Sequence, residues 1–342
     1  IMQAQKVIIK GRLDFGSSKS FEKVVSLFQH RLENFYKNDT LIKPEEMFDP
    51  ESHSFIIPRL VTQAFPKTWN NTISAFEYIA QFAVTGNIHA FMSENGNIIR
   101  KNYIEPPNDK QAVRAYQNGI KLVDDPAQQG QALQYLDEAI TAYDKHAMAY
   151  EKRGYVKYLL KQLDGALIDF NKSIGVDDQN PEPYVGKATI LGLQEKRQEA
   201  ISTLDEALKL CFPLQPIYWK IRRIKGHLHL QEGQFQEAAQ DFKFFLNKKF
   251  DKDNPNYAWQ RVIMWDYANA LIQLHELEEA HKWLNLIEET PCTGKKISYK
   301  AFYKVRSQLR QNLGLKNWTT DIEKLNELEE GSKQTQDNLI LS

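Results

Sequence analysis

The sequence has 342 residues, of which 42% are apolar and 26% are charged, and its 44 Lys plus Arg equal its 44 Asp plus Glu. This composition predicts a mostly globular protein of two or three domains, and the charge balance argues against non-specific nucleic-acid binding as its main work. Two cysteines, Cys211 and Cys292, are too few for a disulfide framework or a thiolate zinc site. Because no apolar run approaches the ~20 residues that span a bilayer and the first residues lack a signal-peptide pattern, we expect a cytoplasmic protein without membrane contact.

Residues 1–104 predict a small α+β domain whose pattern matches no family. Its strongest local signal is Asn95-Gly96, because both residues of a tight hairpin turn adopt positive φ. The expected order is β-α-β-α-β-β, with a strand at 6–16, a helix at 21–38 capped by Ser20, a strand at 54–60 weakened by Pro58, a helix at 69–86 stopped by Gly86, and two strands around Asn95-Gly96. The stretch EPPNDK at 105–110 is the expected linker.

From residue 111 the sequence repeats itself. Ala166 and Phe170 are followed 34 residues later by Ala200 and Leu204, and the same register places Ala132 before them. The small residues that mark the register are separated by 34, 34, 38 and 42 residues as far as residue 280. The extra residues fall in the proline-bearing joints CFPLQP and NKKFDKDNPN, so each unit is about the length of one helical hairpin.

This pattern resembles the tetratricopeptide repeat, through its period, the aromatic-x3-glycine spacing of Tyr150 and Gly154, and the pair Ala166 and Phe170. The resemblance covers 111–290 in five units, although Lys161 stands where the family has a turn glycine. It implies a mainly α fold, an α-solenoid of about five helical hairpins plus a capping helix, preceded by the α+β domain. It also implies an inner groove that binds extended peptides or partner helices.

Gly154 lies inside a predicted helix, where glycine costs roughly 1 kcal/mol relative to alanine. We interpret it as structural, because small residues let two helices approach while an aromatic or Leu of the next helix fills the space. Burying a Phe contributes about 1.5–3 kcal/mol, which outweighs that cost. The expected structural positions of this kind are Gly154, Ala166, Ala188, Ala200, Gly226, Ala238, Ala268 and Ala280.

The chain after the repeats changes from basic to acidic. Residues 291–318 predict a basic capping helix, and residues 319–342 an acidic tail with one short helix, which could fold back as the counter-charge. Three interpretations of the basic helix stay open: a solvated face, a surface for an acidic protein, and RNA binding, in which aromatic side chains add stacking. The cations are Lys295, Lys296, Lys300, Lys304, Arg306, Arg310 and Lys316, interleaved with Tyr299, Tyr303 and Trp318.

The candidate binding residues lie on the first helices of the repeats. Lys220, Arg223 and His227 are spaced by three and four residues, so they share one helix face. The resemblance places this face in the groove, together with Trp265, Asn269 and Tyr155 of other units. It also implies a grip on a carboxylate by Lys, Arg and Asn, but the first three units lack the Lys and Asn pair that chaperone-tail binding needs. The alternatives are therefore a solvated basic face and a groove for a partner bearing acidic groups.

The leading hypothesis is a non-enzymatic protein–protein adaptor, for which we expect residues 111–318 alone to stay folded and bind the partner without the tail. The alternatives are an enzyme or effector with an active site in the α+β domain, and RNA binding through the capping helix. No cofactor or metal is expected, since His227 and His229 lie about 200° apart on a helix, and homo-oligomerisation stays open. The residues that could build an active site are His30, His53, His89, Asp14 and Glu77.

Overall fold

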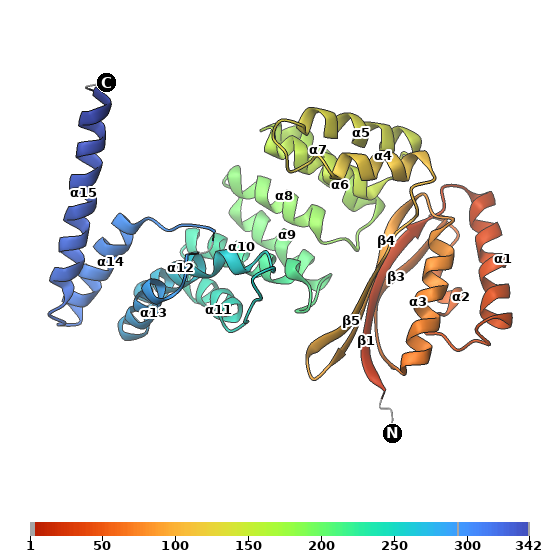
Figure 1. Cartoon of the computed structure of the whole chain (residues 1–342), viewed down its shortest axis with the longest axis horizontal. Coiled ribbons are helices and arrows are strands. Elements are labelled where there is room, and N and C mark those ends of the chain that lie inside the picture. Colours follow the sequence, from red (N-terminus) through yellow and green to blue (C-terminus); the bar gives the residue numbers. More distant parts are fainter. Residues whose placement is uncertain (1–3, 293, 341–342) are drawn as a thin grey trace. The chain divides into compact units, whose positions relative to one another are not determined.

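The computed structural model describes residues 4–292 and 294–340, with side chains described as far as residue 330 (Figure 1). The fold is mainly helical with one antiparallel sheet near the N-terminus, as the sequence predicts. The chain divides between Ile190 and Leu191 into two compact units.

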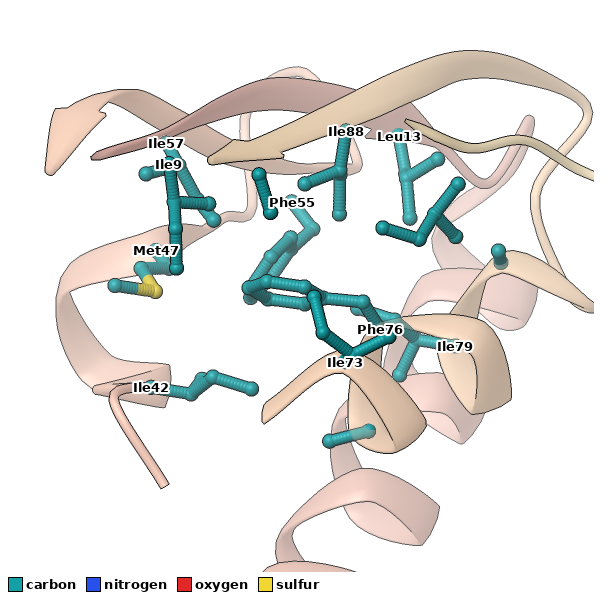
Figure 2. Packing of buried hydrophobic residues seen from close by; sticks show 14 of the residues in the cluster. Ile9, Leu13, Ile42, Met47, Phe55, Ile57, Ile73, Phe76, Ile79 and Ile88 are labelled. Atoms are coloured by element: carbon teal, nitrogen blue, oxygen red, sulfur yellow. The ribbon is translucent and has the colours of Figure 1, made fainter. Parts of the chain in front are cut away.

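The first unit begins with a five-stranded antiparallel sheet in the order β2-β3-β1-β4-β5. Helices α1 and α3 contribute to a single apolar core on one face of the sheet, in which Phe55 and Ile88 lie above Phe76 (Figure 2). The elements are β1 (Gln5–Asp14), α1 (Ser18–Asn34), α2 (Pro44–Met47), β2 (Phe48–Asp49), β3 (Ser54–Ala64), α3 (Pro66–Ala80), β4 (Thr85–Glu94) and β5 (Asn97–Ile104).

The predicted hairpin is confirmed, with Asn95 and Gly96 at φ 51° and 79° between β4 and β5. The prediction of a helix stopped by Gly86 is wrong, because α3 ends at Ala80 and Gly86 lies in β4 opposite Leu13. Glycine is required there by a φ of 110° and by the close approach of β1: a β-carbon at Gly86 would lie 2.0 Å from the carbonyl oxygen of Arg12.

Three smaller boundary predictions are also wrong. The N-cap of α1 is Ser17, whose hydroxyl accepts a hydrogen bond from the Ser20 amide, so Ser20 lies in the first turn. The helix ends at Asn34 rather than residue 38, because Lys37 and Asn38 adopt left-handed conformations. Strand β3 runs to Ala64, beyond the predicted residue 60, and Pro58 is accommodated where its pairing with β1 shifts register.

The ten helices of the five predicted pairs are all present in the predicted order. Each turn inside a pair, from the second pair on, has one residue with positive φ, namely Lys161, Glu195, Gly233 and His275, at the intervals of 34, 38 and 42 residues found in the sequence. The helices are α4 (Gln111–Ile120), α5 (Gln129–Ala142), α6 (Ala147–Leu159), α7 (Leu163–Val176), α8 (Glu182–Leu193), α9 (Arg197–Lys209), α10 (Pro216–Gln231), α11 (Phe235–Leu246), α12 (Gln260–Gln273) and α13 (Leu277–Glu289), with a 3₁₀ turn η1 (Tyr257–Trp259) before α12.

The small residues allow the close packing that we expected. A β-carbon at Gly154 would lie 3.0 Å from the ring of Phe170, and one at Gly186, which the sequence analysis did not single out, would lie 2.3 Å from it. Phe170 of α7 therefore fills the space that glycines of α6 and α8 leave open. Gly226 does the same for Phe242, and the alanines at the predicted positions 166, 188, 200, 238, 268 and 280 are fully buried.

The first unit joins the sheet to the first helix pairs. Arg12 of β1 forms an ion pair with Asp14 and donates a hydrogen bond of 2.9 Å to the carbonyl of Val176, the last residue of α7. Buried His146, the N-cap of α6, lies 3.1 Å from the hydroxyl of Thr85 in β4. These contacts fix the sheet to α6 and α7.

The chain ends in a sixth helix pair rather than a single capping helix. Helix α14 (Tyr299–Asn312) buries Phe302 in the core of the second unit, and α15 (Trp318–Ile340) turns back along it (Figure 1). The prediction of a short helix in the tail is wrong, because α15 has 23 residues. The prediction that the tail supplies the counter-charge is confirmed by Asp321, which lies fully buried between Arg306 and Arg310.

Candidate partner-binding site

Arg223 of α10 lies against an aromatic ring rather than against a carboxylate of the described part of the chain. Its guanidinium carbon lies 3.7 Å from the centre of the Trp259 ring, so the charge rests on an aromatic face. Burial lowers the pKa of Arg223 to about 10, and its Nε has no hydrogen-bond partner. Among the described side chains, no carboxylate forms an ion pair with Arg223. A desolvated cation of this kind favours an incoming anion.

A second cation contacts the same tryptophan. The ammonium of Lys295 lies 5.1 Å from the centre of the Trp259 ring, and its backbone amide donates to the carbonyl of Ala258. Gly294 permits this approach, because its φ is 118° and a β-carbon there would lie 2.8 Å from that of Ala258. Arg223, Trp259 and Lys295 together are called the Arg223 site below.

The other residues of the predicted basic face are placed differently. His227 lies 3.2 Å from the carboxylate of Asp266, a hydrogen bond that raises the pKa of His227. Lys220 lies one turn before Arg223 on α10 and is half-buried. All three residues therefore lie on α10, and the imidazole of His227 is bound to Asp266 of α12.

Three predicted groove residues have local structural roles. Trp265 packs against Phe302 of α14, and the side-chain amide of Asn269 donates to the carbonyl of Trp265. Tyr155 belongs to the first unit, where its ring stacks on Tyr158. Trp259 lies in a joint between helices and no helical spacing links it to Arg223, so the sequence pattern does not predict it as part of the site.

Most cations that neighbour Arg223 in sequence are paired. Arg222 binds Asp241 at 2.6 Å, and Lys225 binds Asp205 at 2.8 Å. Asp169 is the residue equivalent to Asp241 two repeats earlier. It is buried and binds Arg153 and Lys157, both at 2.7 Å. These ion pairs are part of the repeat structure. Arg222 takes part in one of them, whereas Arg223 contacts Trp259 instead.

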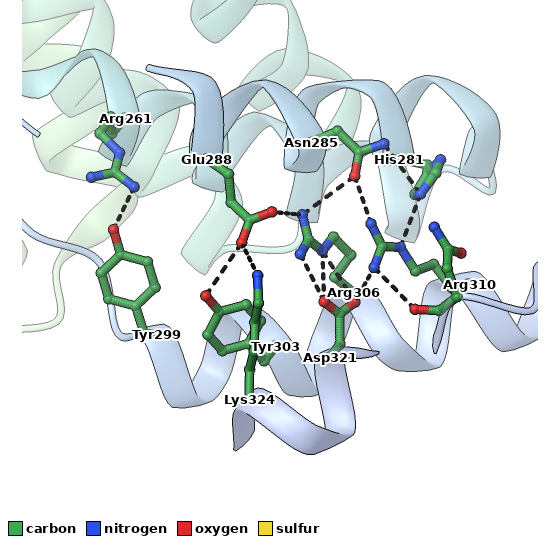
Figure 3. A network of polar contacts seen from close by, with 11 residues as sticks. Arg261, His281, Asn285, Glu288, Tyr299, Tyr303, Arg306, Arg310, Asp321 and Lys324 are labelled. Atoms are coloured by element: carbon green, nitrogen blue, oxygen red, sulfur yellow. Dashed lines mark hydrogen bonds and ion pairs between the residues drawn. The ribbon is translucent and has the colours of Figure 1, made fainter. Parts of the chain in front are cut away.

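Carboxylates of the second unit neutralise part of the positive charge of the basic capping helix. Arg306, only 2% exposed, binds Asp321 at 2.7 Å and Glu288 at 2.8 Å, while Arg310 binds Asp321 at 2.8 Å (Figure 3). These two of the seven predicted cations cannot reach a phosphate, which weakens the case for RNA binding. Residues 111–318 lack the carboxylate between the two arginines, so the structure favours a stabilising contribution from the tail.

The candidate catalytic residues of the α+β domain do not converge. Asp14 is held by Arg12 and by the hydroxyl of Ser54, and His30 is exposed on α1 beside Asn34. His53 lies against Phe21, Glu77 is on α3, and His89 packs on Tyr103, where burial lowers its pKa to about 4. A cavity of about 500 Å³ between α1 and residues 38–50 is lined by none of these five.

No protein-family model matches the chain. Over 78 residues it is 30% identical to the TPR repeat-containing protein MJ1428 of Methanocaldococcus jannaschii, a match that covers 23% of this chain and only 14% of that protein. Two solved structures are similar: PilF of Pseudomonas aeruginosa, with a TM-score of 0.54 and 18% identity over 69% of this chain and 99% of that one, and PilW, a type IV pilus biogenesis factor, with 0.51 and 17% over 68% and 99%. These likenesses establish the fold. Among the described residues, no helix is both long and apolar enough to cross a bilayer.

Proposed function

We propose that this tetratricopeptide-repeat protein is a non-enzymatic scaffold whose second unit binds an acidic segment of a partner protein at the Arg223 site. The observation that supports the proposal is the environment of the Arg223 guanidinium. This group is partly desolvated and lies on the Trp259 ring, and no carboxylate among the described side chains forms an ion pair with it. The solved structures of similar fold support a role in assembly, since PilW is a type IV pilus biogenesis factor.

The desolvation and the fixed orientation of the Arg223 guanidinium both favour binding of a carboxylate. Desolvation destabilises the charged form, as the lowered pKa indicates, and a carboxylate from a partner would compensate it. Trp259 holds the guanidinium plane in place, so little side-chain entropy is lost on binding. Lys295, on the same ring, adds a second charge that favours acidic over neutral segments.

The test uses a blocked peptide with several glutamates and the same peptide with every Glu replaced by Gln, titrated into the full chain. We expect the glutamate peptide alone to bind, and Arg223→Gln to weaken it about tenfold or more, because a hydrogen bond to a charged group contributes about 1.5–3 kcal/mol. Lys209→Gln, an exposed cation of α9, is the matched control and should leave binding unchanged. Equal affinity of wild type and Arg223→Gln would rule out the proposed site.

A further inference from the structure

Arg261, a buried arginine of the second unit, borders a cavity that the Arg223 site does not include. The cavity has a volume of about 380 Å³ and is lined by Arg261 of α12, Glu288 of α13, Tyr299 and Tyr303 of α14, and Leu328 of α15. Figure 3 shows Arg261 and Tyr299 next to the network formed by Glu288, Arg306 and Asp321. These five lining residues are called the Arg261 pocket. Its volume is in the range of small-ligand sites.

Arg261 carries a charge that no described carboxylate compensates. The residue is only 6% exposed, and its Nε has no hydrogen-bond partner. Burial alone would lower the pKa of Arg261, but a hydrogen bond of 2.6 Å from its Nη2 to the hydroxyl of Tyr299 and the interaction with the Cys292 thiol raise it. Neither partner is a carboxylate, so an added carboxylate would form a stronger, charge-assisted hydrogen bond with this guanidinium.

Glu288 lines the same pocket but is already neutralised. It accepts hydrogen bonds from Arg306 at 2.8 Å and Lys324 at 3.1 Å. Burial alone would raise the pKa of Glu288, but these two partners lower it to about 2, so the carboxylate is ionised and occupied. It therefore does not supply the missing counter-ion of Arg261.

Among the described residues, positive charge exceeds negative charge here. The ion-paired network contains three cations, Arg306, Arg310 and Lys324, against two carboxylates, Glu288 and Asp321, which leaves a formal charge of +1. Arg261, beside this network, adds one more positive charge. His281 does not change this count at neutral pH, since burial and the nearby Arg310 lower its pKa. The network is thus complementary to an added anion.

We infer that the Arg261 pocket receives the carboxylate of one Asp or Glu side chain of a partner polypeptide. The guanidinium provides the charge, and the Tyr299 hydroxyl, which accepts from Arg261, still has its own proton to donate. Tyr303 and Leu328 offer apolar surface to the methylene groups of such a side chain. The ionised Glu288 at the wall opposes a dianion more strongly than a monoanion, which favours a carboxylate over a phosphate.

The simplest probe is propionate, which reproduces the glutamate side chain. Sodium propionate, sodium phosphate and sodium chloride are compared at equal ionic strength, following the arginine Nε–H resonances of the ¹⁵N-labelled full chain, with Arg261 assigned through Arg261→Met. We expect propionate to shift the Arg261 resonance saturably, with chloride giving no such shift and phosphate binding more weakly. Phosphate binding more tightly than propionate, or an equal response to chloride, would overturn the inference.

Variants separate this pocket from the Arg223 site. We expect Tyr299→Phe to weaken propionate binding about threefold to tenfold through loss of one donor to a charged group. Arg223→Gln should leave it unchanged, so that a failure of either site is visible independently.

The source of the carboxylate is tested by a blocked peptide with one glutamate. We expect this peptide to compete with propionate at the Arg261 resonance and to bind at least several-fold more tightly, because its backbone and neighbouring residues add contacts. Its Gln counterpart should not compete. A peptide no better than propionate would overturn the assignment to a polypeptide and leave a small free carboxylate as the ligand.

Discussion

Replacing Asp321 by Asn is the sharpest test of how the second unit ends. The carboxylate is fully buried and binds Arg306 at 2.7 Å and Arg310 at 2.8 Å. Removing one partner of a buried ion pair costs about 3–5 kcal/mol, because the remaining charge stays buried. Arg306 keeps Glu288, whereas Arg310 loses the only carboxylate with which it forms an ion pair among the described residues, so we expect a loss of about 3 kcal/mol.

The loss can be measured by urea and thermal unfolding of the full chain. Five of the six tryptophans lie in the second unit, so their fluorescence reports mainly on it. For a unit of this size, about 3 kcal/mol corresponds to a decrease of roughly 6–12 °C in Tm. The loss should persist at high salt, since buried pairs are screened less than exposed ones.

Glu323→Gln provides the matched control, because Glu323 is an exposed acid of the same helix. Its unfolding free energy should stay within about 0.5 kcal/mol of wild type. If Asp321→Asn changes stability no more than Glu323→Gln, the buried network does not stabilise the last helix pair and the reasoning is refuted.

Three further outcomes are expected. Gly186→Ala should destabilise the chain by about 1–3 kcal/mol in urea unfolding, because the new methyl group overlaps the Phe170 ring. Gly175→Ala, on the exposed side of α7, should be neutral or stabilising by up to ~1 kcal/mol. Equal effects of the two substitutions would contradict this packing. The raised pKa of His227 means that its bond to Asp266 stabilises the fold below the ordinary pKa of 6.5 and that this contribution is lost as pH rises through the higher folded value. His227→Gln should therefore flatten this part of the stability–pH curve, and an unchanged curve would contradict it. The lowered pKa of Glu288 acts in the opposite direction: its contribution is present above about pH 4.5 and lost as pH falls towards 2, so Glu288→Gln should reduce the acid sensitivity of unfolding, and an unaltered acid limb would exclude the pairing.

The repeats were predictable because their signal is local and recurrent. A small residue and a large apolar residue at a fixed offset, such as Ala166 and Phe170, determine how two adjacent helices pack. The boundary error at Gly86 has a different origin. A glycine after an apolar helical pattern reads as a helix stop, but here it serves the close approach of two strands, β1 and β4, that are far apart in sequence.

The candidate sites could be predicted only in part, for the same reason. Arg222 and Arg223 are adjacent in sequence and chemically identical, yet Arg222 meets Asp241 of the next helix, while Arg223 meets Trp259. The side chain that an arginine contacts therefore decides whether the arginine forms an internal ion pair or can bind a partner's carboxylate. Helical spacing places a residue on a face but does not give the residues that this face contacts.

The same distinction decides where a stable fragment begins and ends. The repeat pattern suggests cutting at residues 111 and 318, but the first cut removes β4, against which His146 of α6 lies, and β1, whose Arg12 holds the end of α7. The second cut removes Asp321 and leaves Arg306 and Arg310 facing each other without it. Repeat boundaries follow the period of the helices, whereas the units that fold follow the buried polar contacts between them. A fragment of residues 111–318 should accordingly be less stable than the same repeats within the full chain, and an equal unfolding temperature of the two would show that these contacts contribute nothing.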